Sequence, residues 1–304
     1  MKVNYLIAFC CCFSKFIFVK SDFSLHFRNF LILRYGADVQ RRLERSDIGF
    51  GILGSFGGKI FETDIIKNDP IIFVHAASCR AGSFLPNYFH FLFKGYIAAE
   101  MYSTTWGNGR TPVCLKTLAC DDVKQIRGLI VAVNEYTNRT VDIIAFGEGS
   151  AIARKAILGG TCVDIFNDTL GQPLTPLIDT FVSVGGLNYG KQNCTPQLGG
   201  CNLNNGQHCS SEFMRDINNQ SDRYEGTYSY YIYSDNDYII GRDCCSNICS
   251  ELRNANSASR QIMPHGELFD ATKDIQLEMI QYHSNTTLSN TNALFYNYNP
   301  LFKF

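Results

Sequence analysis

The chain has 304 residues, of which 45% are hydrophobic, 13% aromatic and 18% charged, enough for one large domain with a sizeable apolar core. Its 27 basic and 28 acidic residues give a formal net charge of -1. Nothing in this balance suggests the basic surface that is typical of nucleic-acid-binding proteins, so we expect no nucleic-acid partner.

The first residues predict export from the cell. Lys2 precedes an apolar run from Tyr5 to Phe13, which is the pattern of a secretory signal peptide. A membrane anchor is the alternative, but it requires about 20 apolar residues without a charge, and Lys15 interrupts this run. We expect a signal peptide over residues 1–21, a single domain over residues 22–304 and no transmembrane span in the mature chain.

Apolar runs and helical patterns alternate along the rest of the chain. The run 70–75 is continuously apolar, as in a strand that is buried on both faces of a parallel sheet. The other strands are predicted from similar apolar runs, and the helices from apolar residues at helical spacing. Asp121 is a plausible cap at the start of one helix, and Gly159-Gly160 ends another. In chain order these are a helix over 38–45, the strand 70–75, a helix from Asp121, a strand over 141–146, a helix over 150–158, strands over 180–184 and 228–233, and a helix over 272–282.

This order of elements predicts the fold class. Strands that alternate with helices form a mainly parallel central sheet with helices on both faces, so we expect an α/β protein. Right-handed crossovers bring the carboxyl ends of such strands to one edge, where functional sites form. Residues 188–209 are rich in Gly, Asn and Cys and predict a disulfide-pinned loop.

The cysteines agree with export. Three of the thirteen, Cys10–Cys12, lie in the expected signal peptide, and the remaining ten are an even number, as in a disulfide framework. A zinc site is the alternative, but no histidine pairs at ligand spacing accompany these cysteines, so we expect no metal. We expect most of the ten to be paired, with Cys194, Cys201 and Cys209 bonded within or close to their own loop.

Glycosylation motifs point to the same compartment. An Asn-x-Ser/Thr triplet is an acceptor for N-linked sugar in a secreted protein, although each triplet is a weak signal alone. Five occur here, at Asn138, Asn167, Asn193, Asn219 and Asn285.

Three positions at the ends of predicted elements carry groups that together could form a catalytic site. The turn 147–149, Gly-Glu-Gly, joins a buried strand to a helix, as in a nucleophile elbow, which usually reads G-x-S-x-G. Asp235 and Asp237 follow the strand that ends at Tyr233, and His265 precedes the last helix. Singly, such an Asp is often a turn former and such a His structural. Their shared order of nucleophile, acid and histidine favours a catalytic site.

Several longer stretches resemble the class 2 lipases, in particular the secreted lipase-like proteins of nematodes. The resemblance covers about Tyr35 to Tyr282 and implies an α/β-hydrolase fold, hydrolysis of carboxylic esters of lipids such as triacylglycerols, and no cofactor or metal. The matching stretches are Tyr35–Val39, Gly54–Gly58, Pro70–His75, Thr105–Gly107, Val141–Ile144, Ala153–Gly160 and Val182–Val184.

The resemblance also assigns site residues. It places the triad acid on Asp237, with Asp235 as the runner-up, and the general base on His265. The oxyanion loop, usually His-Gly, here reads His75-Ala76. The nucleophile turn usually reads Tyr- or His-Ser-Met-Gly-Ser and here reads Phe146-Gly147-Glu148-Gly149-Ser150. Gly147 therefore stands at the position of the nucleophilic serine, and Ala76 and Glu148 lie at the oxyanion site.

This departure changes the expected activity. Glycine has no side chain, so no acyl-enzyme can form at Gly147, and loss of such a serine costs about 10⁶ in kcat. Neither neighbour is a good substitute, because Ser150 should point away from the histidine and Glu148 would repel a developing oxyanion. We expect a secreted protein of the lipase lineage with little or no turnover. The alternatives are an active esterase and a silent homologue that binds a lipid, an acyl ester or a protein partner.

Overall fold

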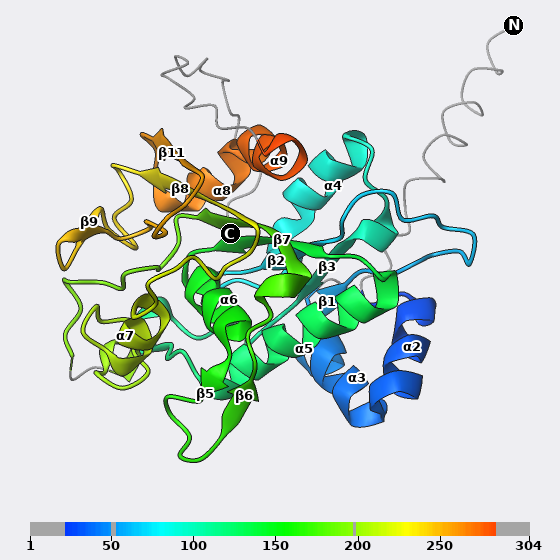
Figure 1. Cartoon of the computed structure of the whole chain (residues 1–304), viewed down its shortest axis with the longest axis horizontal. Coiled ribbons are helices and arrows are strands. Elements are labelled where there is room, and N and C mark those ends of the chain that lie inside the picture. The colour runs from blue at the N-terminus through cyan, green and yellow to red at the C-terminus, as the bar shows by residue number, and fades with distance from the viewer. Residues whose placement is uncertain (1–21, 50–52, 197–198, 284–304) are drawn as a thin grey trace, which may run out of the picture.

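The computed structural model describes residues 22–49, 53–196 and 199–283. The expected signal peptide and the triplet at Asn285 lie outside these residues. The described chain forms a seven-stranded sheet in the order β1-β3-β2-β4-β7-β8-β11 (Figure 1). Neighbouring strands are parallel except β1, which is antiparallel to β3. The α/β fold with a mainly parallel central sheet is thereby confirmed.

The elements have the following bounds. The strands of the main sheet are β1 (Ser55–Phe56), β2 (Ile71–Val74), β3 (Met101–Thr104), β4 (Val141–Phe146), β7 (Ile178–Val184), β8 (Tyr228–Ser234) and β11 (Ser257–Gln261). Two short pairs lie apart from it, β5 (Gly160–Thr161) with β6 (Thr169–Gly171) and β9 (Asp243–Cys244) with β10 (Asn247–Ile248). The helices are α2 (Leu25–Tyr35), α3 (Ala37–Glu44), α4 (Leu85–Phe93), α5 (Cys120–Thr137), α6 (Glu148–Leu158), α7 (Glu212–Asn218), α8 (His265–Ala271) and α9 (Lys273–Tyr282). None of these helices is long and apolar enough to cross a membrane.

Alternate residues of the central strands enter two separate apolar cores. In β2, Ile72 and Val74 join a core that includes side chains of α2, α3, α5 and α6, whereas Ile71 and Phe73 join a core with α4, α8 and α9. This alternation follows from the two-residue period of a strand. Because helices cover both faces, every residue of β2 is apolar, and the strand is recognisable in the sequence as an uninterrupted apolar run.

Most predicted elements occur close to their expected bounds. The runs 70–75 and 141–146 form β2 and β4, which are adjacent and parallel near the middle of the sheet. Asp121 is not a cap, because α5 already begins at Cys120 and Asp121 lies in its first turn, where a negative charge still favours the helix dipole. Helix α6 begins at Glu148, two residues earlier than expected, directly after Gly147.

Three strands of the main sheet are not predicted from the sequence: the two-residue β1, β3 and β11. Strand β3 ends in Ser103 and Thr104, which are buried because their hydroxyls donate to the carbonyls of Phe73 (3.0 Å) and Leu43 (2.6 Å). Strand β11, Ser-Ala-Ser-Arg-Gln, lies at the edge and pairs only with β8. Strands β3 and β11 carry polar residues that a search for apolar runs passes over, and β1 is too short to show a pattern.

Disulfides pin the loops, as expected. The structure pairs eight of the ten cysteines beyond residue 21 and leaves Cys79 and Cys114 as free thiols. The prediction that Cys209 bonds close to its own loop is wrong, since its partner lies 36 residues away beside β9. The pairs are Cys120–Cys162, Cys194–Cys201, Cys209–Cys245 and Cys244–Cys249.

Removal of the Cys120–Cys162 disulfide should lower stability. This bond ties the start of α5 to the β5–β6 hairpin and closes a loop with a sequence separation of 42. Replacing both cysteines by serine should lower the free energy of unfolding by about 2–4 kcal/mol, because the unfolded chain gains conformational freedom. Urea titration measures the change, and Cys114→Ser, at an exposed free thiol, is the matched control. Equal stability of the double variant and the control would contradict this expectation.

Candidate active site

The turn between β4 and α6 holds Gly147 in a backbone conformation that favours glycine. Its φ and ψ are 54° and -127°, a region that costs other residues on the order of 1–3 kcal/mol. Its amide donates to the carbonyl of Val184 (3.1 Å), and its carbonyl accepts from the amide of Leu187 (2.9 Å). Gly149 allows α6 to approach β2, since a Cβ there would lie 2.3 Å from the carbonyl oxygen of His75. The turn thus has a backbone conformation that suits the predicted nucleophile elbow, with glycine at residue 147.

His265 and Asp237 meet in front of this turn. Nδ1 of His265 lies 2.6 Å from Oδ2 of Asp237, and both side chains are buried. The other carboxylate oxygen of Asp237 accepts the amides of Ile239 (3.0 Å) and Ile240 (2.9 Å), which fixes its orientation. The opposite ring nitrogen of His265, Nε2, would lie 3.4 Å from a Cβ at residue 147. The imidazole therefore faces residue 147 directly, at contact distance from a Cβ placed there.

The runner-up carboxylate lies in a different environment. Asp235 accepts from Nε of Arg260 (2.8 Å) and lies 3.6 Å from Nε of Arg242. The hydrogen bond from Arg260 lowers the pKa of Asp235, which keeps it ionised. Of the two candidate acids, Asp237 is the one that is hydrogen-bonded to His265, whereas Asp235 lies between Arg242 and Arg260.

Two apolar side chains restrict the space between His265 and residue 147. The ring of Phe146 stacks on the imidazole, with centroids 4.6 Å apart and planes inclined by 20°. On the other side, the Cβ of Ala76 would lie 2.9 Å from a Cβ at residue 147, closer than two such carbons normally approach. The surroundings fit a glycine, and a serine here would require Ala76 to move.

The side chain of Glu148 contacts the loop after β2, where the sequence analysis predicts the oxyanion site. In this fold the oxyanion is held by the amide of the residue after the nucleophile and by an amide of a strand-to-helix loop. Here Oε2 of Glu148 accepts the amide of Ala77, in the loop after β2 (3.1 Å), and Oε1 lies 3.3 Å from Nζ of Lys191. Glu148 is only 1% exposed. The amide of Ala77, a candidate donor to an oxyanion, is therefore already hydrogen-bonded to the carboxylate of Glu148.

The sequence analysis names Ala76 and Glu148 but not Ala77 or Lys191. Ala77 contributes only its backbone amide, so its residue type carries no signal. Lys191 lies 43 residues beyond Glu148 in the disulfide-pinned loop, and no local spacing relates the two.

Ser150 forms hydrogen bonds with partners other than His265. Its side chain is completely buried, and its hydroxyl lies 2.9 Å from the hydroxyl of Ser183 and 2.7 Å from Oδ1 of Asn188. These partners belong to a buried hydrogen-bond network, whereas no hydrogen bond of Ser150 in the described chain involves His265. The hydroxyl stabilises the packing of α6 against its neighbours.

His75 anchors the loop that carries Ala76 and Ala77. Its Nδ1 lies 2.7 Å from the carbonyl of Ala76, its Nε2 accepts the amide of Trp106 (3.0 Å), and its ring stacks on the indole with planes inclined by 9°. This pattern requires a neutral imidazole with its proton on Nδ1. Complete burial lowers the pKa of His75 from 6.5 to about 3.

His75 should make the protein less stable in acid. Below pH 6.5 the unfolded chain protonates this imidazole, whereas the folded chain does not until about pH 3. Stability from His75 is therefore fully present above pH 6.5 and is lost as pH falls, by about 1.4 kcal/mol per pH unit. The difference in unfolding free energy between wild type and His75→Gln should shrink at that rate between pH 6 and pH 4.5. Denaturant titrations at several pH values measure it, and a constant difference would contradict the expectation.

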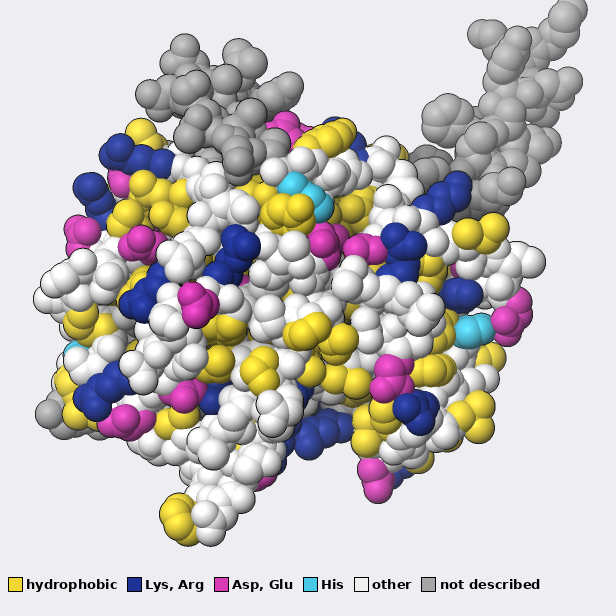
Figure 2. All heavy atoms as spheres, viewed as in Figure 1, with side chains coloured by type: hydrophobic (Ala, Val, Ile, Leu, Met, Phe, Trp, Pro, Cys, Tyr) yellow, Lys and Arg dark blue, Asp and Glu magenta, His cyan; other side chains and the backbone are white. Residues whose placement is uncertain are grey.

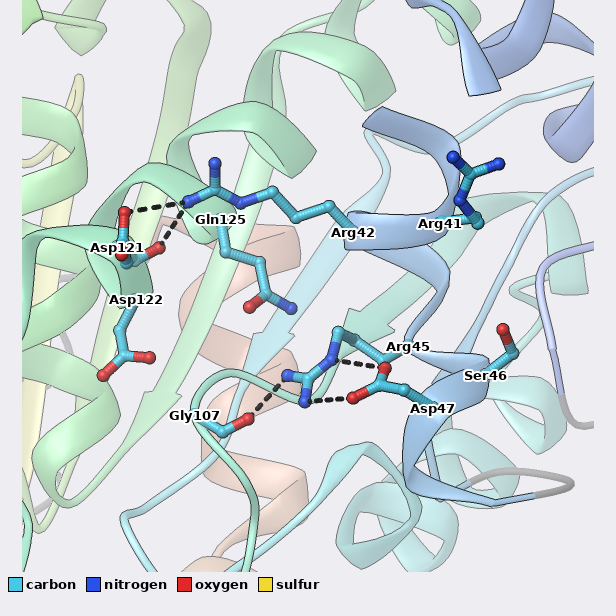
Figure 3. A pocket seen from close by; sticks show the side chains of 9 residues that line it. All are labelled: Arg41, Arg42, Arg45, Ser46, Asp47, Gly107, Asp121, Asp122 and Gln125. Atoms are coloured by element: carbon cyan, nitrogen blue, oxygen red, sulfur yellow. Dashed lines mark hydrogen bonds and ion pairs between the residues drawn. The ribbon is translucent and has the colours of Figure 1, made fainter. Parts of the chain in front are cut away.

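A polar surface pocket of about 530 Å³ lies between α3 and α5, lined by residues that do not include His265 or Gly147. Its cations already have partners (Figure 3): Arg45 donates to Asp47 (2.8 Å) and to the carbonyl of Gly107 (2.6 Å), and Arg42 donates to the carbonyl of Asp121 (3.0 Å). Because these arginines are already paired within the chain, the pocket offers no free cation to a ligand from them, and the His265 region remains the candidate site.

Solved structures with a similar fold are lipases and esterases. Bacillus licheniformis lipase BlEst2 in its propeptide form has a TM-score of 0.54 at 12% identity, over 78% of this chain and 55% of that chain. The mature form has a TM-score of 0.51 at 14% identity, over 74% and 96%. Aspergillus fumigatus lipase B has a TM-score of 0.48 at 14% identity, over 68% and 50%. This chain spans about half the length of the first and third proteins, and at these identities the likeness establishes the α/β-hydrolase fold alone.

Sequence comparison identifies the family. No curated protein sequence matches the chain significantly. The family model described as lipase (class 2) matches residues 68–278, which is more than half of the chain and includes the elbow, Asp237 and His265. The chain belongs to the class 2 lipase family.

Proposed function

We propose that this protein is a secreted member of the lipase lineage that binds a lipid or an acyl ester and does not hydrolyse it. The observation that carries the proposal is the combined change at the elbow. Gly147 offers no nucleophile to His265, and Glu148 occupies the amide of Ala77.

The chemistry explains why both changes matter. In ester hydrolysis a serine attacks the carbonyl, the histidine takes its proton, and amides stabilise the oxyanion that forms. His265, oriented by Asp237, can still accept a proton at Nε2, but residue 147 has no oxygen to release one. A water molecule in the gap could give up a proton, yet the oxyanion would then form beside the carboxylate of Glu148. Both routes to hydrolysis are therefore blocked.

Two exposed apolar side chains that are close to Asp237 and His265 in the sequence support a lipid-like ligand. Tyr238 directly follows Asp237 and is 86% exposed, and Ile262, three residues before His265, is 75% exposed. Large apolar groups at a protein surface favour contact with an apolar ligand. Lipid esters are also the substrates that the family suggests. Four disulfides, the glycosylation triplets and the predicted signal peptide support secretion.

An ester-hydrolysis assay on the secreted protein tests the absence of turnover. The full chain with its own residues 1–21 is expressed in a eukaryotic secretory host, purified from the medium and assayed with a short-chain nitrophenyl ester. Wild type and His265→Ala should hydrolyse the ester at the same background rate. Robust wild-type turnover that His265→Ala abolishes would overturn the proposal and reveal another nucleophile.

A binding assay tests the ligand. A fluorescent monoacylglycerol should bind the wild type and bind more weakly to the double variant Tyr238→Ser, Ile262→Ser. Leu33→Ser is the matched control, because Leu33 is also highly exposed but lies on α2, across the molecule from β8 and β11 (Figure 1). Absence of binding, or equal losses in the double variant and the control, would count against a lipid site beside His265.

A further inference from the structure

The β5–β6 hairpin projects from the body of the molecule (Figures 1 and 2). The disulfide Cys120–Cys162 and the ion pair Lys124–Asp168 fix its base to α5. At its tip, in contrast, Phe166 is 92% exposed. The base is therefore held in place by covalent and ionic contacts, while the tip presents an aromatic ring to solvent.

Asn167 follows Phe166 in the tightest part of this tip. Its φ is 59°, in the left-handed region that Asn tolerates better than most residues, and the amide of Asp168 reaches back to the carbonyl of Ile165 (3.4 Å). Asn167 and Thr169 form a glycosylation triplet and are both exposed. Across the described ranges, no hydrogen bond engages the side chain of either residue. The acceptor amide and the hydroxyl of the triplet are both accessible in the folded protein.

The other described triplets have groups that are already engaged. The hydroxyl of Thr140, in the triplet of Asn138, donates to Asp69 (2.7 Å). Cys194, in the triplet of Asn193, is bonded to Cys201, and the hydroxyl of Ser221, in the triplet of Asn219, donates to Asp222 (3.0 Å). Asn167 is thus distinguished from Asn138 and Asn219 by its free hydroxyl partner, and from Asn193, whose triplet is tied down by a disulfide at its middle residue, by its projecting position.

We infer that Asn167 carries an N-linked glycan whose first sugars cover the ring of Phe166. The inference rests on the proposed secretion, because this modification occurs in the secretory pathway. The amide nitrogen of Asn167 forms a bond to the anomeric carbon of an oligosaccharide, the bond from that carbon to a lipid pyrophosphate breaks, and the amide loses a proton. The apolar face of the attached sugar then lies beside the ring of the preceding residue.

Variants of the triplet test the site. Wild type, Asn167→Gly, Thr169→Ala and Thr169→Ser are secreted from eukaryotic cells behind a signal peptide from another protein, and glycans are counted by intact mass before and after treatment with an N-glycosidase. Asn167→Gly and Thr169→Ala should lose one glycan, whereas Thr169→Ser should keep it. Glycine accepts the positive φ, so the turn is preserved in Asn167→Gly. A wild-type protein whose peptide map shows unmodified Asn167 would overturn the inference.

A hydrophobic dye tests the cover over Phe166. Asn167→Gly should bind more dye than wild type, and adding Phe166→Ser should remove the increase. An unchanged dye signal in Asn167→Gly would overturn the claim that the glycan covers this ring. The borrowed signal peptide ensures export, so these variants report on the acceptor site itself. Failure of the protein's own residues 1–21 to direct secretion would refute the proposed secretion, on which the inference rests, and is distinguishable from failure of Asn167 to accept a glycan.

Discussion

Gly147→Ser alone should remain close to background on short-chain esters, and adding Ala76→Gly with Glu148→Met should raise hydrolysis about 10²–10³-fold above it. This range is the effect of one oxyanion donor in enzymes where it has been measured. The serine in the triple variant would lie before Nε2 of His265, whose Nδ1 is held by Asp237.

Each added change removes a specific obstacle. A side chain at residue 147 would place its Cβ 2.9 Å from that of Ala76, and Ala76→Gly removes the colliding carbon. Glu148 binds the amide of Ala77, and Glu148→Met frees that amide and removes a negative charge from the site of the developing oxyanion. The serine itself should cost on the order of 1–3 kcal/mol of stability, because of the positive φ.

The measurement is kcat/KM for the wild type, the single variant and the triple variant. Thermal unfolding of each protein shows whether a silent variant is folded. Adding His265→Ala to the triple variant is the control and should return hydrolysis to background. If Gly147→Ser alone is as active as the triple variant, Glu148 and Ala76 are not obstacles. If the folded triple variant is silent, the assignment of this region as a former triad is wrong.

Glu225→Ala should lower the free energy of unfolding by about 3–5 kcal/mol, the range for removal of one member of a buried ion pair. Arg154 and Glu225 have side chains only 3% and 2% exposed, and Nε of Arg154 donates to Glu225 across 2.9 Å. The guanidinium also donates to the carbonyls of Asn188 and Ile217, which joins α6 to two distant segments. Without Glu225 a buried positive charge loses its counter-ion.

Urea titration gives the free energy, and an exposed ion pair supplies the control. Glu212, in contrast, is exposed at the surface of α7, where it pairs with Arg215 one helical turn away. Glu212→Ala should therefore change the free energy of unfolding by less than about 0.5 kcal/mol. Similar losses in both variants would show that burial does not strengthen the Arg154–Glu225 pair.

Local patterns in the sequence determined much of the framework. The uninterrupted apolar runs of β2 and β4 reported burial on both faces, and the glycines after β4 marked the sharp turn into α6. The residue type at position 147 also limits the chemistry there, because glycine has no nucleophilic side chain whatever its surroundings. The spacing of apolar residues and the backbone freedom of glycine are properties of neighbouring residues. They can therefore be recognised in the sequence without knowledge of the fold.

Tertiary structure alone decided how distant groups meet. Asp235 and Asp237 are two residues apart and equally placed after β8, yet the loop path brings only Asp237 to His265, 28 residues away. The contact of Glu148 with Ala77 and Lys191 likewise joins three separate segments of the chain. These contacts depend on where loops return to the sheet edge, and that path is set by packing and disulfides across the whole domain rather than by the identity of nearby residues.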